Sequence, residues 1–526
     1  MADTLALSLD ESRPFSLQQQ LYTRLREDIL MGRLRPGEKV PATRALAAQL
    51  AVSRTTAVVA YEQLLAEGYI ETRRGAGSFV SSQLPDDTLR AESPATPGGP
   101  NGTLGTGTAR AVVVAPRHAT RRLSRWGDRL RASGGAPFQG DESLTERHTP
   151  MPFDFRPGRP DWDAFPHQLW SRLASRRWRQ RSAEMGSYGD PAGYRPLREA
   201  IARHLAQSRG VRADADRVVV VNGSQQGIDL LIRLWLDPDE CAALEDPGYP
   251  GAALALRAHG ARILPISVDE DGLRVDALPS PKEPDAPRMV YVTPSHQFPT
   301  GATLSLPRRL RLLEWAARRG ALVVEDDYDS EFRYSGRPLE SLQGLDANGV
   351  AAYVGSFSKA LFPPLRVGFV VLPEGLARPF VAAKWLADRQ TATPDQQVLS
   401  DFIHEGHFER HLRRMRRLYA ARRGALLTAL EEHLGGLVTP GGDGAGLHLV
   451  AWLPAGCDAH ALATRVARLG VATAPVGPYY AAGTGRSGLM LGFAALDEDT
   501  IAEGVRRLAQ ATRAPHYRAG RREVPP

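Results

Sequence analysis

Apolar residues recur at helical spacing near the start of the chain and predict a packed first helix. Leu17, Leu21, Leu25 and Ile29 follow one another every four positions, so they share one face of a helix. Gly32 can end this helix, because glycine readily adopts the left-handed backbone found at helix ends. The pattern therefore predicts that the first folded unit begins with a helix whose apolar face is buried.

Two further helices and a hairpin complete this unit. A short helix is expected from about Thr43, and Ser53 is a suitable N-cap for a third helix over residues 54–67. Two short strands then flank a glycine-containing turn, which predicts a hairpin over residues 69–80. Helices and a hairpin in this order are typical of a winged helix-turn-helix, an α+β unit that we place at residues 14–82.

The second half of the chain alternates apolar runs with amphipathic segments. This alternation predicts an α/β domain with a doubly wound sheet, which we place at residues 151–515. The predicted strands are 218–221, 242–245, 262–266, 289–293, 322–325, 350–354 and 367–372. The predicted helices include 168–181, 195–207 and an arginine-rich helix over 408–423, for which we expect a solvated face.

A linker, residues 83–150, is expected between the two domains. Gly, Pro, Thr and Ser dominate residues 92–108, and such a segment cannot bury a core, so we expect it to be flexible. A basic run follows at residues 110–131, with Leu123, Trp126 and Leu130 between its arginines. This run fits either a solvated amphipathic helix or an additional DNA-contacting element, and the pattern leaves both open.

Composition narrows the class of protein. The length of 526 residues exceeds one ordinary domain, and the net charge of +7 permits nucleic-acid binding without establishing it. Two cysteines, Cys241 and Cys457, indicate neither a disulfide framework nor a metal cluster. The chain lacks a signal-peptide pattern and any apolar run of about 18 residues. We therefore expect a multidomain cytoplasmic protein with no membrane contact and no metal site.

The first unit carries residues suited to operator DNA. Its third helix would lie in the major groove, with hydroxyl and guanidinium groups at its N-terminus facing bases and phosphates. Small residues in the hairpin would let the wing approach the DNA backbone closely. The alternative is a small helical docking module with solvated arginines. The predicted DNA-binding residues are Arg44, Ser53, Arg54, Thr55, Thr56, Arg73, Gly75 and Gly77.

One stretch of the second domain, residues 353–368, indicates a specific cofactor. Lys359 can form a Schiff base with an aldehyde. Ser356 and Ser358 precede this lysine and Arg366 follows it, and together they can hold a dianionic phosphate. Pyridoxal 5'-phosphate (PLP) is an aldehyde with a phosphate, so the stretch predicts PLP. The alternative is a surface lysine and arginine beside a loop.

A second stretch, residues 321–329, supports this prediction. An apolar strand ends there in carboxylates and a tyrosine, and ligands of open α/β sheets bind at the carboxyl ends of strands. Asp326 could pair with the pyridinium nitrogen of PLP, with Asp327 as the competing choice, and Tyr328 could donate to the ring hydroxyl oxygen.

Together these residues resemble the class I/II aminotransferases, which are fold-type I PLP-dependent enzymes. The loop 246–250 looks like the family loop whose aromatic residue, here Tyr249, stacks on the pyridine ring. The segment 222–226 looks like the helix start that cradles the phosphate, which implies roles for Ser224 and Gln225.

At two further positions the sequence departs from the motifs of this family. Residues 299–301 resemble the end of the Asn-Pro-Thr-Gly motif, but Phe298 stands where many of these enzymes have asparagine. His296 or Gln297 would then replace its contact with the ring hydroxyl. The family also has an arginine for the substrate carboxylate near the C-terminal end, and Arg486 is the nearest candidate.

The first unit resembles the GntR family of bacterial regulators, through stretches such as Pro36-Gly37-Glu38-Lys39-Val40-Pro41 and Tyr61-Glu62-Gln63-Leu64. Both halves together resemble the MocR subfamily, which joins a winged helix-turn-helix to an aminotransferase-like PLP-binding domain. The resemblance implies a head-to-tail homodimer in which residues 188–193 line the partner's site. Two functions follow: a transcription regulator that binds PLP, alone or as an adduct with an amino compound, or an active aminotransferase with a DNA-binding domain.

Overall fold

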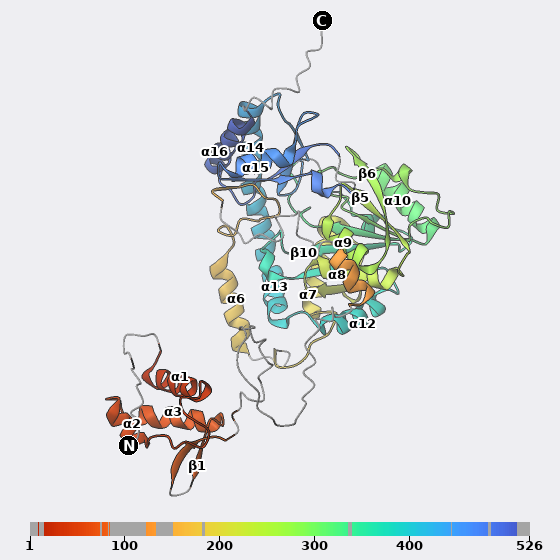
Figure 1. Ribbon diagram of the computed structural model, residues 1–526. Coiled ribbons are helices and arrows are strands. Elements are labelled where there is room, and N and C mark those ends of the chain that lie inside the picture. The colour runs from red at the N-terminus through yellow and green to blue at the C-terminus, as the bar shows by residue number, and fades with distance from the viewer. Residues whose placement is uncertain are drawn as a thin grey trace, which may run out of the picture. The chain divides into compact units, whose positions relative to one another are not determined.

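The computed structural model describes residues 9, 15–73, 76–82, 84, 123–132, 151–180, 185–334, 339–442, 444–481 and 485–512. Figure 1 shows the chain, which divides into two compact units, Met1–Arg117 and His118–Pro526. None of the described helices is long and apolar enough to cross a membrane.

The first unit is a cluster of helices with a two-stranded antiparallel hairpin. Leu21, Leu25 and Ile29 of the first helix pack with Leu46 of the second and Tyr61 of the third in one apolar core. The predicted winged helix-turn-helix is thereby confirmed. Its elements are α1 (Leu17–Leu30), α2 (Thr43–Gln49), α3 (Arg54–Ala66), β1 (Ile70–Arg73) and β2 (Gly77–Val80).

The second unit is built on a mixed eight-stranded sheet. Its strands are β4 (Val218–Val221), β5 (Cys241–Asp246), β6 (Arg262–Asp269), β7 (Gly272–Leu273), β8 (Met289–Val292), β9 (Leu322–Asp327), β10 (Ala351–Ser356) and β11 (Gly368–Val371). The order across the sheet is β4-β11-β10-β9-β8-β5-β6-β7. Strands β11 and β7 run antiparallel to their neighbours, and the other neighbouring strands are parallel. The central strands read as continuous apolar runs because both faces are covered.

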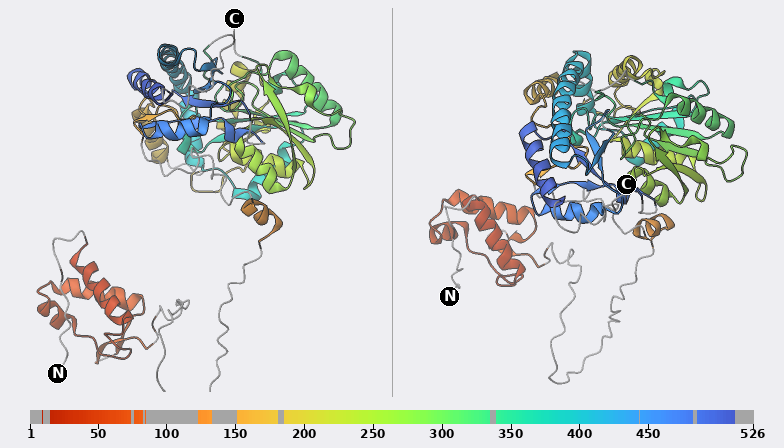
Figure 2. Two further views of the ribbon diagram at one scale, coloured as in Figure 1. Left: turned by 45° about the horizontal axis from the view of Figure 1, so that its top comes forward. Right: turned by 90° about the horizontal axis from the view of Figure 1, so that it is seen from above.

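Helices lie on both faces of this sheet, as the views in Figure 2 show. They are α7 (Arg195–Arg209), α8 (Ser224–Trp235), α9 (Pro250–His259), α10 (Leu306–Arg319), α11 (Leu342–Leu345), α12 (Ala377–Asp388) and α13 (Thr393–His404), with short 3-10 turns η3 (Ala215–Arg217), η4 (Val275–Ala277) and η5 (Pro363–Leu365). One face packs on α8, α9 and α12 through residues such as Leu231 and Leu256. The other face packs on α7, α10 and α13 through residues such as Ile201 and Leu312.

A smaller four-stranded sheet and a long helix form the C-terminal part. The elements here are β3 (Phe153–Asp154), α6 (His167–Gln180), α14 (His407–Leu434), β12 (Thr439–Gly441), β13 (His448–Trp452), α15 (Ala459–Ala467), β14 (Val471–Ala472), β15 (Ala474–Pro475), η6 (Gly477–Tyr479), β16 (Gly488–Gly492) and α16 (Glu498–Thr512). The small sheet has the order β12-β13-β16-β15. β3 pairs in parallel with β14, which ties the beginning of the second unit to this part. The helix predicted over 408–423 continues to Leu434, because Leu426 and Leu430 extend its buried face.

One described piece of the linker, α4 (Arg125–Ala132), belongs to the second unit. Its Arg129 donates hydrogen bonds to the carbonyl oxygens of Ala258 and His259, at 2.8 and 2.7 Å. These carbonyls lie at the C-terminal end of α9, where a cation is favourable. Arg129 therefore docks on the second unit, and the part of the basic run before residue 123 lies outside the described residues.

Candidate functional site

A cavity of about 700 Å³ lies at the carboxyl ends of β9 and β10, a size typical of small-molecule sites. It brings together residues that are far apart in the sequence and that come from several loops. Nine residues predicted from the sequence line it: Lys359, Asp326, Tyr328, Tyr249, Ser224, Gln225, Ser356, Ser358 and Arg366.

Lys359 reaches into this cavity from the loop after β10. Its Nζ donates a hydrogen bond to the carbonyl oxygen of Gly158, at 2.8 Å. Gly158 has a φ of +81°, and a Cβ there would lie 2.7 Å from Nζ, so a side chain at this position would collide with the lysine. Burial lowers the pKa of the Lys359 amine, and the Arg366 charge lowers it further. The neutral amine is the nucleophilic form, and a lowered pKa makes it a larger fraction of the molecules than on an exposed lysine.

Hydroxyl and guanidinium groups gather where α8 begins. Ser356 Oγ donates to Ser358 Oγ at 2.9 Å, and Arg366 Nη2 donates to the carbonyl oxygen of Asn222 at 2.9 Å. Arg366 has a φ of 53°, in the left-handed region that residues other than glycine rarely adopt. A Cβ at Gly223 would collide with this guanidinium, so the glycine lets the arginine approach the helix start. The helix N-terminus, the hydroxyls and the arginine together suit a phosphate dianion.

The two neighbouring carboxylates at the end of β9 have different surroundings. Asp326 lines the cavity, and its Oδ2 accepts a hydrogen bond from the Tyr291 hydroxyl at 2.6 Å. Its buried Oδ1 has no hydrogen-bond partner among the described residues. Burial raises the pKa of Asp326 to about 7. Asp327 instead accepts from Arg209 at 2.8 Å and from Tyr353 at 2.7 Å, and does not line the cavity.

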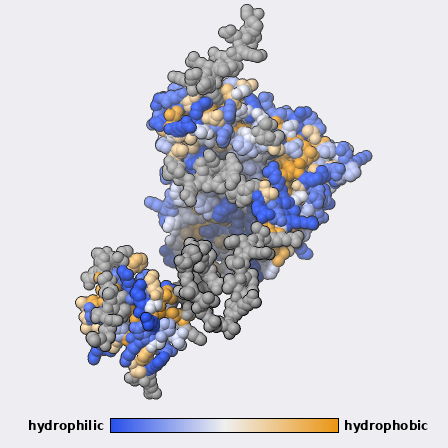
Figure 3. Space-filling view, in the orientation of Figure 1, coloured by the Kyte–Doolittle hydropathy of each residue, from blue (hydrophilic) through white to orange (hydrophobic). Residues whose placement is uncertain are grey.

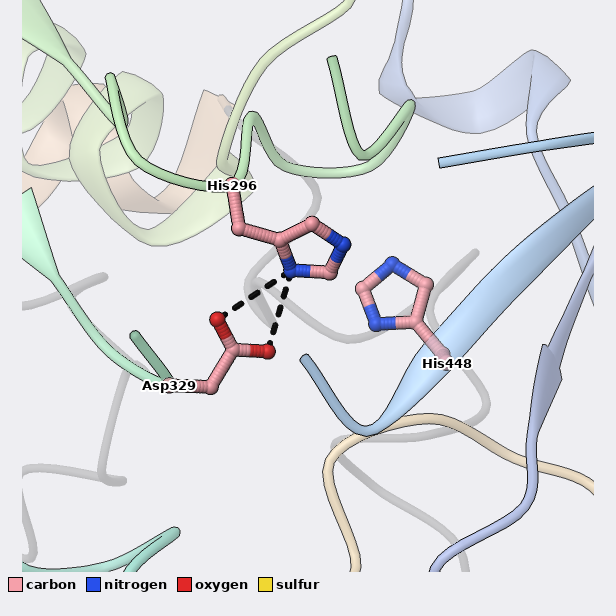
Figure 4. A group of neighbouring side chains, drawn as sticks. All are labelled: His296, Asp329 and His448. Atoms are coloured by element: carbon pink, nitrogen blue, oxygen red, sulfur yellow. Dashed lines mark hydrogen bonds and ion pairs between the residues drawn. The ribbon is translucent and has the colours of Figure 1, made fainter. Parts of the chain in front are cut away.

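His296, Asp329 and His448 form a buried cluster, which Figure 4 shows, and the Tyr328 hydroxyl contacts its His296. His296 Nδ1 lies 3.1 Å from both carboxylate oxygens of Asp329 and 3.0 Å from the Tyr328 hydroxyl. Burial lowers the pKa of His296, but the Asp329 carboxylate outweighs this effect, and the net result is a raised pKa. His296 does not line the cavity, but it contacts Asp329 and Tyr328, which do.

The same cluster has the residue types of a metal site, although the sequence indicated none. Its ligand atoms lie within 4.8 Å of one another. His448 Nε2 lies 3.1 Å from the carbonyl oxygen of Pro299, and burial lowers the pKa of His448 to about 4. A Cβ at Gly446 would collide with the His296 ring, so the main chain packs directly against the cluster.

Besides His296, two predicted residues do not line the cavity. Gln297 is buried and donates to the carbonyl oxygens of Pro247 and Phe298, at 2.8 and 2.6 Å, so it holds the loop rather than a ligand. Arg486 is exposed, and its guanidinium lies 4.6 Å from the centre of the Trp452 ring. Neither residue lines the cavity, which leaves the assignment of Arg486 to a substrate carboxylate without support from its position.

Several cavity residues carried no site prediction. Arg156 and Arg159 lie between β3 and α6, and Tyr291, Asp329 and His448 come from three other segments. The Lys359–Gly158 hydrogen bond spans 201 residues of sequence, so local spacing could not reveal it. Polar residues at strand ends were the signal available, and they pointed to the ends of β9 and β10 but not to Arg156 or Arg159.

The predicted DNA-binding residues lie on the surface of the first unit. Arg44, Arg54 and Thr55 are exposed at the beginnings of α2 and α3. Ser53 caps α3, because its Oγ accepts from the backbone N–H of Thr56 at 3.1 Å. In the hairpin, Arg73 pairs with Glu71 at 2.7 Å and lies 4.6 Å from the centre of the Phe79 ring. Gly77 has a φ of +107°, and Gly75 lies outside the described residues.

Comparisons with known proteins identify both units. Residues 17–80 match the bacterial regulatory proteins of the gntR family, and residues 167–508 match aminotransferase class I and II. The crystal structure of LysN, an α-aminoadipate aminotransferase from Thermus thermophilus, has a TM-score of 0.67 and 34% identity, covering 74% of this chain and 96% of that one. The class is therefore a GntR-type DNA-binding unit joined to a fold-type I aminotransferase fold.

Two full-length relatives define the family. The probable rhizopine catabolism regulatory protein MocR of Rhizobium meliloti is 36% identical, over 96% of this chain and 95% of the relative. The HTH-type transcriptional regulator TauR of Rhodobacter capsulatus is 35% identical, over 95% of this chain and 97% of the relative. The chain belongs to this MocR-type family of GntR regulators with an aminotransferase-like domain.

Proposed function

We propose that this protein is a DNA-binding transcription regulator whose aminotransferase-like domain binds pyridoxal 5'-phosphate, alone or as an adduct with an amino compound, as its effector. The observation that carries the proposal is the presence, in one chain, of a GntR-type unit and of a cavity with a lysine and an unsatisfied carboxylate oxygen.

The residues of the cavity fit PLP. The buried Oδ1 of Asp326 could accept the pyridinium N–H, which would give that oxygen a partner. Ser356, Ser358 and Arg366, beside the start of α8, would hold the phosphate. Lys359 would hold the aldehyde end. When bound, PLP supplies an aldehyde that captures primary amines and a ring that withdraws electrons.

The buried cluster that contacts Tyr328 would orient its hydroxyl. If His296 carries a proton on Nδ1, it donates toward Asp329 and the Tyr328 oxygen, and the tyrosine keeps its own proton for a ligand. The raised pKa of His296 favours this protonated form. Tyr328 can then donate to the ring hydroxyl oxygen, the contact for which Phe298 has no donor.

We propose a homodimer, with a head-to-tail arrangement as in the family resemblance. Exposed aromatic and apolar side chains gather near the segment that would reach the partner: Tyr188 is 79% exposed and Leu386 is 78% exposed. Arg389 stacks on both Tyr188 and Trp385, which links these side chains. Contiguous apolar patches on a protein surface often mark interfaces, and Figure 3 shows apolar patches among mainly hydrophilic residues on the face in view.

An active aminotransferase is the second candidate, because the lysine has a lowered pKa and the solved structures that resemble this domain are aminotransferases. The regulator and the enzyme can be distinguished by measuring DNA affinity and turnover of amino donors. DNA fragments from the gene's own promoter would be titrated with the protein, with and without PLP, at a fixed salt concentration. We expect the affinity to change with PLP. A DNA affinity that PLP does not change, combined with turnover of amino donors at enzymatic rates, would favour the enzyme.

For a regulator that acts on bacterial operators we expect a cytoplasmic location.

A further inference from the structure

A second cavity, of about 410 Å³, lies in the second unit outside the cofactor cavity. Three segments line it: the C-terminal half of α7, the loop after β9 and the N-terminal half of α14. Among the described residues, none lines both cavities. The proposed function gives this second cavity no role, although much of its lining is charged. Its charged lining residues are His204, Arg209, Glu331, Arg333, Glu409 and Arg416.

Arg333 is a cation of this lining that lacks an acid partner. Its Nε is buried and has no hydrogen-bond partner among the described residues. Burial lowers the pKa of Arg333, and the positive charge of Arg209 lowers it further. Buried polar groups are almost always hydrogen-bonded, because a buried donor without a partner is costly. An anion in the cavity would supply the charge that Arg333 lacks within the described part of the chain.

The main chain around Arg333 is held in place by a neighbouring loop. Arg333 forms an isolated antiparallel bridge with Ala445. The N–H of Tyr334 donates to the carbonyl oxygen of Gly444 at 3.1 Å. A ligand that binds Arg333 therefore meets a backbone that is already ordered, which lowers the entropy lost on binding.

Arg416 adds a second guanidinium from α14. Its Nε donates to the carbonyl oxygen of Glu331 at 2.6 Å, which ties α14 to the loop that carries Arg333. A guanidinium has five N–H donors in a planar fork, so Arg416 keeps further donors for a ligand. Two guanidiniums from separate segments can bind one group that has several acceptor oxygens.

The acids around the cavity have other partners or a raised pKa. Glu409 lies 3.0 Å from His204 Nδ1, and Asp327, outside the lining, binds Arg209 at 2.8 Å. Burial raises the pKa of the Glu331 carboxyl, and the Asp327 charge raises it further. A neutral Glu331 can donate a hydrogen bond to an anion instead of repelling it.

We propose that this second cavity binds a small oxyanion, a phosphate or a carboxylate, through Arg333 and Arg416. The site is distinct from the cofactor cavity, and its ligand needs no amino group. The two cavities are linked through the chain, because Asp329 lines the first and Arg333, four residues later, lines the second. The protein would therefore hold a second small molecule directly beside its cofactor site.

The test uses the full-length protein loaded with PLP, so that the cofactor occupies its own phosphate site. Sodium phosphate and sodium succinate would be titrated separately by calorimetry, with chloride keeping the ionic strength constant. We expect at least one of them to bind the wild type, and the comparison shows whether the site takes phosphate or carboxylate. Arg333→Gln should weaken this binding by about tenfold or more, because hydrogen bonds to charged groups are strong.

Arg318→Gln is the matched control, because Arg318 is an exposed arginine of α10 outside both cavities, and its affinity should equal that of the wild type. Thermal unfolding checks that each variant is folded. If Arg333→Gln does not fold, Arg416→Gln replaces it, with the same expected loss.

Three results would overturn the proposal: a wild type that binds neither anion, an unchanged affinity in the folded arginine variant, or an equal loss in Arg318→Gln. A protein without a cofactor band would contradict the proposed function but not this site, because Arg333→Gln still tests the second cavity alone.

Discussion

The two units hold their predicted site residues in different environments. In the first unit, Arg44, Arg54 and Thr55 stand exposed on a small apolar core. In the second, Asp326 is buried, Lys359 is partly buried, and burial shifts the pKa of each. DNA is read by donors on a surface, whereas a cofactor needs groups whose protonation the interior controls. Substitutions should therefore separate the two activities.

The largest effect is expected from Lys359→Ala. Removal of the amine should abolish the visible band of the covalently held cofactor, while affinity for a single DNA half-site stays unchanged. Absorbance and borohydride reduction measure the first, and titration of labelled DNA measures the second. Lys282→Ala, an exposed lysine outside the cavity, is the matched control. A reducible band that survives in Lys359→Ala would show that another lysine holds the cofactor.

Substitution of the two neighbouring carboxylates, Asp326 and Asp327, should have different effects. Asp326→Ala should weaken PLP binding by about 1.5–3 kcal/mol, the range for a hydrogen bond to a charged group. Asp327→Ala leaves Arg209 buried without this carboxylate and should destabilise the fold by roughly 3–5 kcal/mol. Cofactor titration and thermal unfolding separate these effects. The assignment is wrong if Asp327→Ala weakens cofactor binding and Asp326→Ala does not.

Acid should destabilise the second unit through His448. Its pKa is about 4 in the folded protein, against 6.5 ordinarily. Below pH 6.5 His448 is protonated in the unfolded chain but remains neutral in the folded protein. Protonation therefore favours the unfolded state, and the free energy of unfolding decreases as the pH falls toward 4. The loss is about 3 kcal/mol at most. Melting temperatures across this range should fall less steeply for His448→Asn than for the wild type or the exposed control His460→Asn. Equal slopes would contradict the low pKa.

The smallest effect is expected in the first unit. Arg54→Ala should weaken operator binding by about 1–3 kcal/mol and leave the cofactor band unchanged. Binding isotherms on operator DNA, together with the absorbance spectrum of the same sample, measure both. A loss of the cofactor band in Arg54→Ala would contradict the claim that substitutions in the first unit leave cofactor binding in the second unit unchanged.

The sequence predicted the first unit well because its signals are local. Ser53 marks the start of α3, and apolar spacing marks the buried face of α1. In the second unit, the strand Val218–Val221 was predicted at its observed bounds, because four consecutive valines favour a buried strand over other structures. The end of α14 was missed because the prediction stopped at the arginine-rich face.

The candidate site was predicted only in part. Motifs indicated Lys359, Asp326 and Tyr328, since these follow strands at one edge of the sheet. Arg156 and Arg159 were missed, because they reach the cavity through contacts with distant segments. Arg486 was only the nearest candidate for the arginine that binds a substrate carboxylate, and that side chain precedes β16 and stacks on Trp452 outside the cavity.

The measurement that tests the central claim most directly compares a paired operator with a single half-site. Affinities for both would be titrated at one fixed salt concentration, with and without PLP, for the wild type and Lys359→Ala. A coupling of about 1–3 kcal/mol would change affinity roughly 5–150-fold. We expect PLP to change the wild-type affinity for the paired operator, with little effect on the half-site or on Lys359→Ala. Equal affinity for the paired operator under all these conditions would contradict the sensor function.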